Sequence, residues 1–109
     1  MNAPIRLLLI FVNEADMVNN RPLYQTIVER LHHLEIAGAT ATAGLMGFGH
    51  HQRVHHKGLF GIPDDRPVTI VAVDEEARLR TIVPEIRRMV REGLMVLVDG
   101  ELIADAVDA

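Results

Sequence analysis

The chain has 109 residues, 49% of them hydrophobic, which is enough for one core but too short for two domains, so we expect residues 1–109 to form a single domain. A formal net charge of −4 leaves no surplus of Lys and Arg for a phosphate backbone, which argues against general nucleic-acid binding. The sequence contains neither Cys nor Ser, which excludes disulfides, thiolate metal sites and serine hydrolysis, and the lack of Cys fits a reducing, cytoplasmic location.

The first predicted element is a strand over residues 5–12. Every side chain from Leu7 to Val12 is apolar, so both alternating sets are apolar, which is typical of a central strand covered on both faces. The run is too short to span a bilayer, and Asn13 and Glu14 follow it at once. We therefore expect neither a signal peptide nor a membrane helix.

A helix is predicted after this strand. The segment Asn19–Pro22 has the composition of a turn and a helix start, because Pro is favoured at the first helical position. Leu or Ile then recurs at helical spacing from Leu23 to Leu34, and the helix is expected to close before Gly38.

Two further strands are predicted in the middle of the chain. Residues 39–45 alternate Ala with Thr, a more polar pattern that favours the edge of a sheet. Residues 68–73 repeat the two-faced apolar character of the first strand, so this strand is also expected to be central.

A second helix is predicted over residues 75–91, with a kink or two abutting segments at Pro84, because proline cannot donate a backbone hydrogen bond. Residues 94–98 predict a fourth strand. Asp99 and Gly100 have the pattern of a tight turn into a short added strand at residues 101–104, and the acidic tail over 105–109 is expected to be loose.

The element order βαββαβ predicts an α+β protein with the ferredoxin-like sandwich, in which strands one and three are central and both helices cover one face. Because these two strands are apolar on the other face as well, that face is expected to be costly to expose to water. Packing of several copies, most simply as a homotrimer, removes this cost. The alternative is a monomer with an exposed apolar face.

The connection over residues 46–66 is the most informative segment. It is rich in Gly and His, and no Asp or Glu occurs between Glu35 and Asp64 in an otherwise acidic chain. Glycines at a strand exit let backbone N–H groups converge on an anion, and Arg53 and Lys57 add positive charge, so a phosphate or carboxylate ligand is indicated. The alternative is a flexible linker in which the glycines only permit a turn.

Two other kinds of site are less well supported by the sequence. Among the loop histidines, His51 and His55 would share a face if the segment were helical, which leaves a metal- or ion-linked accessory role open. No catalytic motif is present, and we expect no enzyme, although a small ferredoxin-like enzyme remains an alternative. Glu14, Asp16 and Asp74 lie at strand ends, where helix capping is the preferred interpretation.

Several motifs together resemble those of the PII-like family known as domain of unknown function 190. The resemblance covers nearly the whole chain, and its most distinctive part is Met-Gly-Phe-Gly followed by Arg-x-His. The matching segments are Ile10–Asp16, Arg21–Tyr24, Gly38–Thr40, Leu45–Gly49, Arg53–His55 and Glu92–Leu94.

The resemblance implies a PII-like trimer with ligand clefts between subunits and a signalling loop at 46–66 that docks onto a membrane transporter, a channel or an enzyme. In place of the phosphate loop of true PII proteins, the chain has the sequence Arg91-Glu92-Gly93-Leu94, and Glu92 would repel a triphosphate. The expected effector is therefore a small anion or a mononucleotide such as AMP or ADP. By the same resemblance, the cleft and loop root comprise Gly44, Gly47, Phe48, Gly49, Arg53 and His55, and the phosphate partners are Arg87, Arg88 and Arg91.

Overall fold

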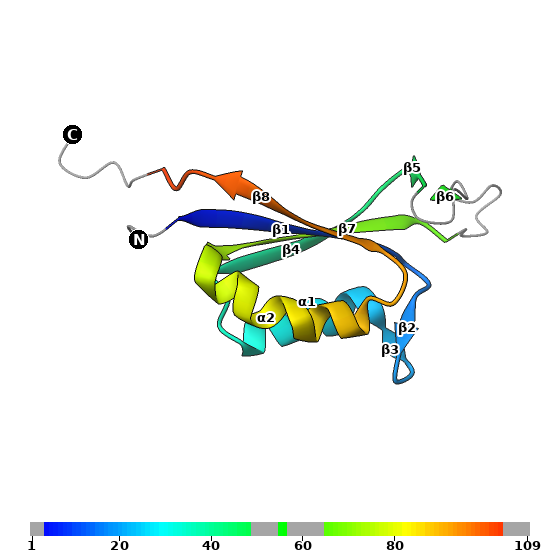
Figure 1. The fold of residues 1–109 in the computed structure, drawn as a ribbon. Helices are drawn as coiled ribbons and strands as arrows, with labels where there is room; N and C mark the ends of the chain where they lie inside the picture. The colour runs from blue at the N-terminus through cyan, green and yellow to red at the C-terminus, as the bar shows by residue number, and fades with distance from the viewer. Residues whose placement is uncertain (1–3, 49–54, 57–64, 104–109) are drawn as a thin grey trace.

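A computed structural model describes residues 4–48, 55–56 and 65–103 of the chain. The secondary structure comprises two helices, one main sheet and two small ladders (Figure 1). In chain order the elements are β1 (Ile5–Asn13), β2 (Met17–Val18), β3 (Arg21–Pro22), α1 (Leu23–His33), β4 (Gly38–Ala43), β5 (Met46–Gly47), β6 (His55–His56), β7 (Pro67–Glu75), α2 (Glu76–Met89) and β8 (Leu94–Gly100).

The main sheet has the strand order β4-β7-β1-β8, and every neighbouring pair is antiparallel. The two strands that are apolar on both sides, β1 and β7, are therefore the central pair, and the Ala-Thr strand β4 lies at an edge. Both helices cover the same side of the sheet (Figure 1). The predicted α+β, ferredoxin-like βαββαβ arrangement is confirmed.

The core fills the space between the helices and one face of the sheet. Leu8 and Ile10 of β1 and Ile70 of β7 point into this space and are at most 1% exposed. Ile27 of α1 and Leu79 of α2 meet them from the helical side and are fully buried. The alternation of strand side chains and the 3.6-residue period of the helices bring these aliphatic groups together, and Tyr24 packs against them from α1.

The opposite face of the sheet, here called the open face, is also apolar. In the strand register, Leu9 of β1 lies between Val71 of β7 and Val96 of β8, and equivalent rows lie on either side. Phe11 is 37% exposed and Val96 is 42% exposed, because no helix covers this side within the protomer. The open face comprises Leu7, Leu9, Phe11, Val71, Val73, Leu94, Val96 and Val98.

The start and end of α1 are both set by residues with positive φ. Asn19 and Asn20, with φ of 50° and 64°, form the two-residue turn of the β2–β3 hairpin, and α1 begins at Leu23 directly after it. At the other end, the amides of Glu35 and Ile36 bond back to His32 and Leu31, the Schellman pattern that ends a helix before Gly38. Glu35 has a φ of 61°, where Gly is usual.

Helix α2 runs without interruption through Pro84, so the prediction of two abutting segments is wrong. Pro84 lies on the exposed side of the helix, where the carbonyl that lacks its usual partner is accessible to water. The prediction that strand-end carboxylates cap the helices is also wrong, because within the described residues neither helix has a side-chain N-cap. Asp74 is 1% exposed and accepts the N–H of Ala37, which ties the α1–β4 connection to β7.

The predicted turn at Asp99 and Gly100 does not form. Both residues continue β8 opposite Arg6 and Ile5, and residues 101–103 follow without regular secondary structure. Asp99 forms an ion pair with Arg6, which explains why a residue typical of turns remains in the strand. The tail predicted over 105–109 lies outside the described residues.

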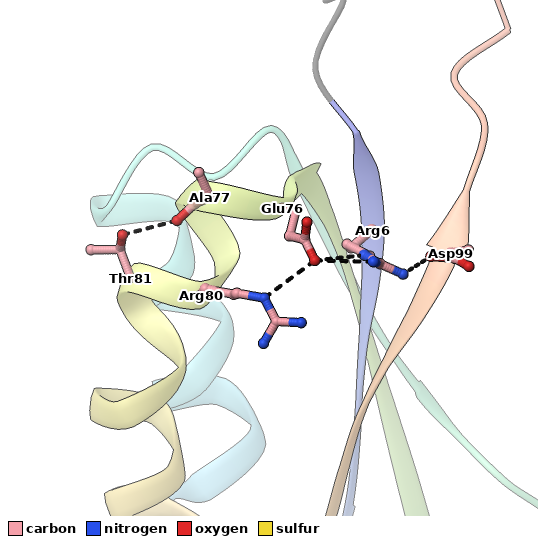
Figure 2. A network of polar contacts seen from close by, with 6 residues as sticks. All are labelled: Arg6, Glu76, Ala77, Arg80, Thr81 and Asp99. Carbon is pink, nitrogen blue, oxygen red and sulfur yellow. Dashed lines mark hydrogen bonds and ion pairs between the residues drawn. The ribbon is translucent and has the colours of Figure 1, made fainter.

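This ion pair belongs to a polar network at the end of the sheet where β1 starts and β8 finishes (Figure 2). The Nε of Arg6 donates to Glu76 at 3.1 Å, and Arg80 of the same helix donates to the same oxygen at 3.2 Å. The hydrogen bond from Arg80, followed by the charge and hydrogen bond of Arg6, lowers the pKa of Glu76. The network joins β1, β8 and the first turn of α2 far from the loop root.

Candidate functional site

The root of the loop over residues 46–66 is packed closely against β7. The amide of Gly44 donates to the carbonyl of Pro67 at 2.7 Å, and a Cβ on Gly44 would lie 3.0 Å from the proline ring. Gly47 faces the same ring, so both glycines allow the chain to pass close to Pro67. Phe48, the next predicted site residue, is 65% exposed.

Part of the loop has secondary structure. Met46 pairs with His56 and Gly47 pairs with His55 in the β5–β6 ladder, so the predicted connection over residues 46–66 contains strand structure that the sequence pattern did not indicate. The backbone of His55 is thus next to Gly47, as the predicted site requires. Gly49, His51 and Arg53 lie outside the described residues.

The far end of the loop is attached to a tight turn at residues 13–16, here called the 13–16 turn. Glu14 and Arg66 form a two-pronged ion pair with contacts of 2.6 and 3.0 Å, and the Glu14 amide donates to the Arg66 carbonyl at 2.8 Å. The Ala15 amide donates to the Asp65 carboxylate at 2.8 Å. Three hydrogen bonds to side chains and one between backbones therefore fix residues 65 and 66 to this turn.

The electrostatics of the pair follow from this geometry. The hydrogen bond from Arg66 lowers the pKa of Glu14, and the same contact raises the pKa of Arg66. Both side chains are therefore charged at neutral pH. Because the pair is partly exposed, solvent screening makes it a weak source of overall stability, and its main effect is on the geometry of the turn.

A hollow of about 690 Å³ lies beside the last turns of α2, a volume typical of small-molecule sites. This hollow, here called the α2 hollow, is bounded by the 13–16 turn, the β2–β3 hairpin, the first residue of α1 and the end of α2. Its lining residues are Asp16, Met17, Val18, Asn19, Leu23, Glu85, Arg88, Met89, Arg91 and Glu92.

Two of the predicted phosphate partners, Arg88 and Arg91, line the α2 hollow. Guanidinium groups match the geometry of phosphate and carboxylate oxygens, so this pair is suited to an anion. Of the lining carboxylates, Glu85 is engaged by both prongs of Arg30, whose hydrogen bond lowers the pKa of Glu85. Asp16 accepts the N–H of Asn13 at 2.9 Å. The apolar part of the lining consists of side chains from the hairpin and the helices.

The third predicted arginine has a different environment. The Nη1 of Arg87 donates to the carbonyl of Gly93 at 2.7 Å, and Arg87 is not among the residues that line the hollow. Gly93 passes very close to β1, since a Cβ there would lie 2.5 Å from the Phe11 carbonyl oxygen. Arg87 therefore holds the turn between α2 and β8 in place, next to the strand that carries Phe11.

The metal alternative receives no support from the part of the chain that the structure describes. No three His, Asp or Glu side chains in that part come together in a way that would hold a metal ion. His51 lies outside the described residues, as does the side chain of His55. None of the described helices is long and apolar enough to cross a membrane.

Sequence reasoning did not find the 13–16 turn or the hairpin side of the hollow. It placed Glu14 and Asp16 at a strand end but did not connect them with Asp65 and Arg66, about fifty positions further along. The available signal was Asn19-Asn20, a pair well suited to a two-residue hairpin turn. The sequence pattern predicts a turn and a helix start at this segment but not the hairpin that the turn closes.

The fold places the chain in a class of ferredoxin-like α+β proteins, and two solved structures of different kinds share this fold. The nitrogen regulatory PII-like protein CPII from Thiomonas intermedia K12, solved with ADP, AMP and bicarbonate, matches with a TM-score of 0.63 and 19% identity, covering 91% of this chain and 88% of CPII. The divalent ion tolerance protein CutA1 from Ehrlichia chaffeensis matches with a TM-score of 0.66 and 12% identity, covering 96% and 89%.

Within this class, the chain belongs to the DUF190 family, described as uncharacterized ACR, whose model matches residues 5–102. A UPF0166 protein from Aquifex aeolicus is 30% identical over 98 residues, which cover 90% of this chain and 92% of that protein. A UPF0166 protein from Methanocaldococcus jannaschii is 27% identical over 95 residues, with coverage of 86% and 87%. The family predicted from the sequence motifs is confirmed.

Proposed function

We propose that the protein is a PII-like regulatory protein without enzymatic activity, which binds a small anionic effector and signals through the loop over residues 46–66. The observation that carries the proposal is the α2 hollow, which Arg88 and Arg91 line. The β2–β3 hairpin and the end of α2, which bound this hollow, lie at the same end of the sheet as β5 of the loop root (Figure 1). The fold shared with CPII, a protein solved with ADP, AMP and bicarbonate, supports an adenine mononucleotide such as AMP or ADP as the effector.

The proposed assembly is a homotrimer that buries the open face. Exposed apolar area costs about 25 cal/mol per Å² to keep in water, and the open face presents eight aliphatic or aromatic side chains in three adjacent rows. Contact between copies removes this cost and creates seams at the sheet edges. At such a seam, the predicted residues of the loop and its root would contact the effector in addition to Arg88 and Arg91. These residues are Gly44, Gly47, Phe48, Gly49, Arg53 and His55.

The proposed output is docking of the loop onto a target in the cytoplasm, such as a membrane transporter, a channel or an enzyme. Three large apolar side chains at the loop root, Leu45, Met46 and Phe48, are between 65% and 82% exposed. Exposed apolar groups of this size are typical of surfaces that bind another protein. The loop root thus offers a contact surface at the same end of the sheet as the proposed effector site (Figure 1).

A ligand screen combined with a measurement of mass tests the proposal. Light scattering at micromolar concentration should give the mass of a trimer. AMP, ADP, ATP and bicarbonate should be compared by thermal shift, because a ligand that binds only the folded state raises the midpoint as its concentration exceeds its dissociation constant. The expected result is a rise with AMP or ADP that is smaller with ATP, whose triphosphate would be repelled by Glu92.

A pair of variants locates the binding site. Arg88→Ala combined with Arg91→Ala should remove the thermal shift caused by the nucleotide. The matched control is Arg80→Ala, which removes a positive charge from the same helix at its opposite end, where Arg80 pairs with Glu76. This control should keep the shift. A monomer that binds none of the four compounds would contradict the proposal.

A further inference from the structure

The 13–16 turn contacts both the α2 hollow and, at residues 65 and 66, the root of the loop. Asp16 lines the hollow, and its carbonyl accepts the amide of Leu23, a second lining residue, at 2.8 Å. The preceding residues, Glu14 and Ala15, hold the far end of the loop through Arg66 and Asp65. The residue that lines the hollow, Asp16, therefore directly follows the two residues that hold the loop, Glu14 and Ala15.

The turn is closed on itself, so its two sides cannot move independently. The amide of Asn13 donates to the Asp16 carboxylate at 2.9 Å, and the amide of Asp16 donates to the Asn13 carbonyl at 3.1 Å. Asn13 also pairs with Pro67 in the sheet, and the Pro67 carbonyl accepts the amide of Gly44. If Asp16 moves, Asn13 and Pro67 are expected to move with it. Pro67 contacts both the segment that enters the loop, at Gly44, and the segment that leaves it, at Arg66.

An anion in the hollow supplies a reason for such a displacement. A phosphate held by Arg88 and Arg91 places negative charge in the same hollow that the Asp16 carboxylate lines. Like charges at short range in a partly desolvated site repel each other, which changes the relative energies of the positions available to Asp16. A neutral occupant has no such effect on this carboxylate.

We infer that the 13–16 turn transmits occupation of the α2 hollow to the loop root, with Glu14 as the positioning residue and a phosphate monoester or carboxylate as the class of ligand. This inference rests on the proposed function and adds to it the site within one protomer and the residues that connect it to the loop. Glu14 does not line the hollow. Its loss should therefore separate binding from the response of the loop.

The absence of Cys from the sequence permits a single fluorescent label in the loop. In protein carrying Gln52→Cys and labelled there, AMP should change the fluorescence anisotropy as it binds. With Glu14→Gln added, AMP should bind with a dissociation constant within about threefold of the parent, because an exposed ion pair contributes little energy. The anisotropy change should fall to less than about half, because the two states of the turn are no longer coupled to the loop.

Two controls distinguish a specific role of Glu14 from general damage. Glu29→Gln breaks the comparable two-pronged pair between Arg21 and Glu29, with contacts of 2.6 and 2.9 Å, and should leave both binding and response unchanged. The double exchange Glu14→Arg with Arg66→Glu rebuilds the pair in reverse and should restore most of the response. This rescue also shows that the loss in Glu14→Gln does not come from misfolding.

The outcomes separate the inference from the proposed function. A full anisotropy response in Glu14→Gln would overturn the coupling and leave the regulatory function intact. Loss of AMP binding together with the response in Glu14→Gln would also overturn it, since Glu14 would then belong to the binding site itself. Failure of the native protein to bind AMP, ADP or bicarbonate at millimolar concentration would remove the proposed function, and the inference with it.

Discussion

The helix-covered face and the open face of the sheet both carry apolar side chains, but helices bury only the first of them. Ile70 and Val71 are neighbours on β7, but Ile70 is fully buried beneath the helices, whereas Val71 lies on the open face beside Leu9. The first face is completed within one chain. The second has the composition of an interior without a covering layer in the protomer, and the proposed trimer would supply that layer.

The largest effect is expected from a charge placed on the open face. Val96→Asp should abolish the proposed trimer, because a carboxylate that became buried against a sister subunit would cost several kcal/mol. The protomer itself should stay folded, since Val96 is 42% exposed on the edge strand β8. Light scattering and circular dichroism together check both statements.

Val96→Thr is the control for this variant, because it keeps the branched shape and has no charge. It should retain most of the assembly. If Val96→Asp had the same mass in solution as the native protein, the open face would not be the surface that joins the copies.

The covered face should respond through stability rather than through assembly. Ile70→Ala should lower the free energy of unfolding by about 2–5 kcal/mol, because it leaves a cavity in a packed core. Val71→Ala, the neighbouring change on the open face, should lower the free energy of unfolding of the isolated protomer by less than half as much. Denaturant unfolding of both variants in the Val96→Asp background measures the difference without a contribution from assembly. Equal costs would show that the two faces are covered alike.

Gly93 tests how tightly the α2–β8 turn is joined to the sheet. Gly93→Ala should destabilise the protein by about 1–3 kcal/mol, because the new Cβ would lie 2.5 Å from a backbone oxygen that cannot easily move. Gly38→Ala is the matched control, since its Cβ would meet only the Val73 side chain, at 3.4 Å. Thermal unfolding should rank the two variants in this order, and the reverse order would contradict the close approach to β1.

Glu35, at the end of the helix layer, offers a small gain in stability. Glu35→Gly should stabilise the protein by about 1 kcal/mol, because Gly adopts a φ of 61° without the strain that a Cβ causes. Glu35→Ala keeps the strain and removes the charge, so it should give no gain. Denaturant midpoints compare the three proteins. A larger gain with Ala than with Gly would point to charge rather than backbone strain.

The smallest expected effect concerns the exposed ion pairs around the covered layer. Hydrogen bonds from arginines lower the pKa values of Glu14, Glu29, Glu76 and Glu85 below 4.5. A carboxylate with a lowered folded-state pKa stabilises the fold above its unfolded pKa, and this contribution is lost as the pH falls through the folded value. The melting temperature should therefore decrease modestly as the pH is lowered from neutrality to about 3. An increase would contradict the assigned pairs.

The two ends of the sheet also differ from each other. The loop root lies at the end of the sheet where both faces stop, and the 13–16 turn connects it to the hollow on the helix side. The opposite end of the sheet is closed by the network of Arg6, Glu76, Arg80 and Asp99 (Figure 2). Ion pairs thus hold both ends of the sheet, and only the end with Glu14 and Arg66 lies next to the candidate site.

Much of the fold could be predicted from local patterns. Apolar residues with a period of two or of 3.6 identified β1, β7, α1 and α2, and the crossover rule placed the two-faced strands at the centre. Predictions failed where the surroundings in the folded chain outweighed a local preference. Asp99 remains in a strand because Arg6 lies opposite, and Pro84 stays within a helix because its exposed position lets water satisfy the freed carbonyl.

The candidate site could be predicted less completely than the fold. The sequence indicated Arg88 and Arg91, and it could not separate them from Arg87, whose contact with the Gly93 carbonyl exists only in the folded chain. The same holds for Glu14 and Arg66, which lie 52 positions apart.

The sequence by itself determined the family, the order of the two helices and the four main strands, and the apolar character of both sheet faces, because these properties depend on residue type and spacing along the chain. Only the tertiary structure decided which acids and bases meet, where the α2 hollow lies and that one turn touches both the hollow and the loop root. Such contacts depend on how segments that are far apart in the sequence pack against each other, and no local pattern of side chains specifies that packing.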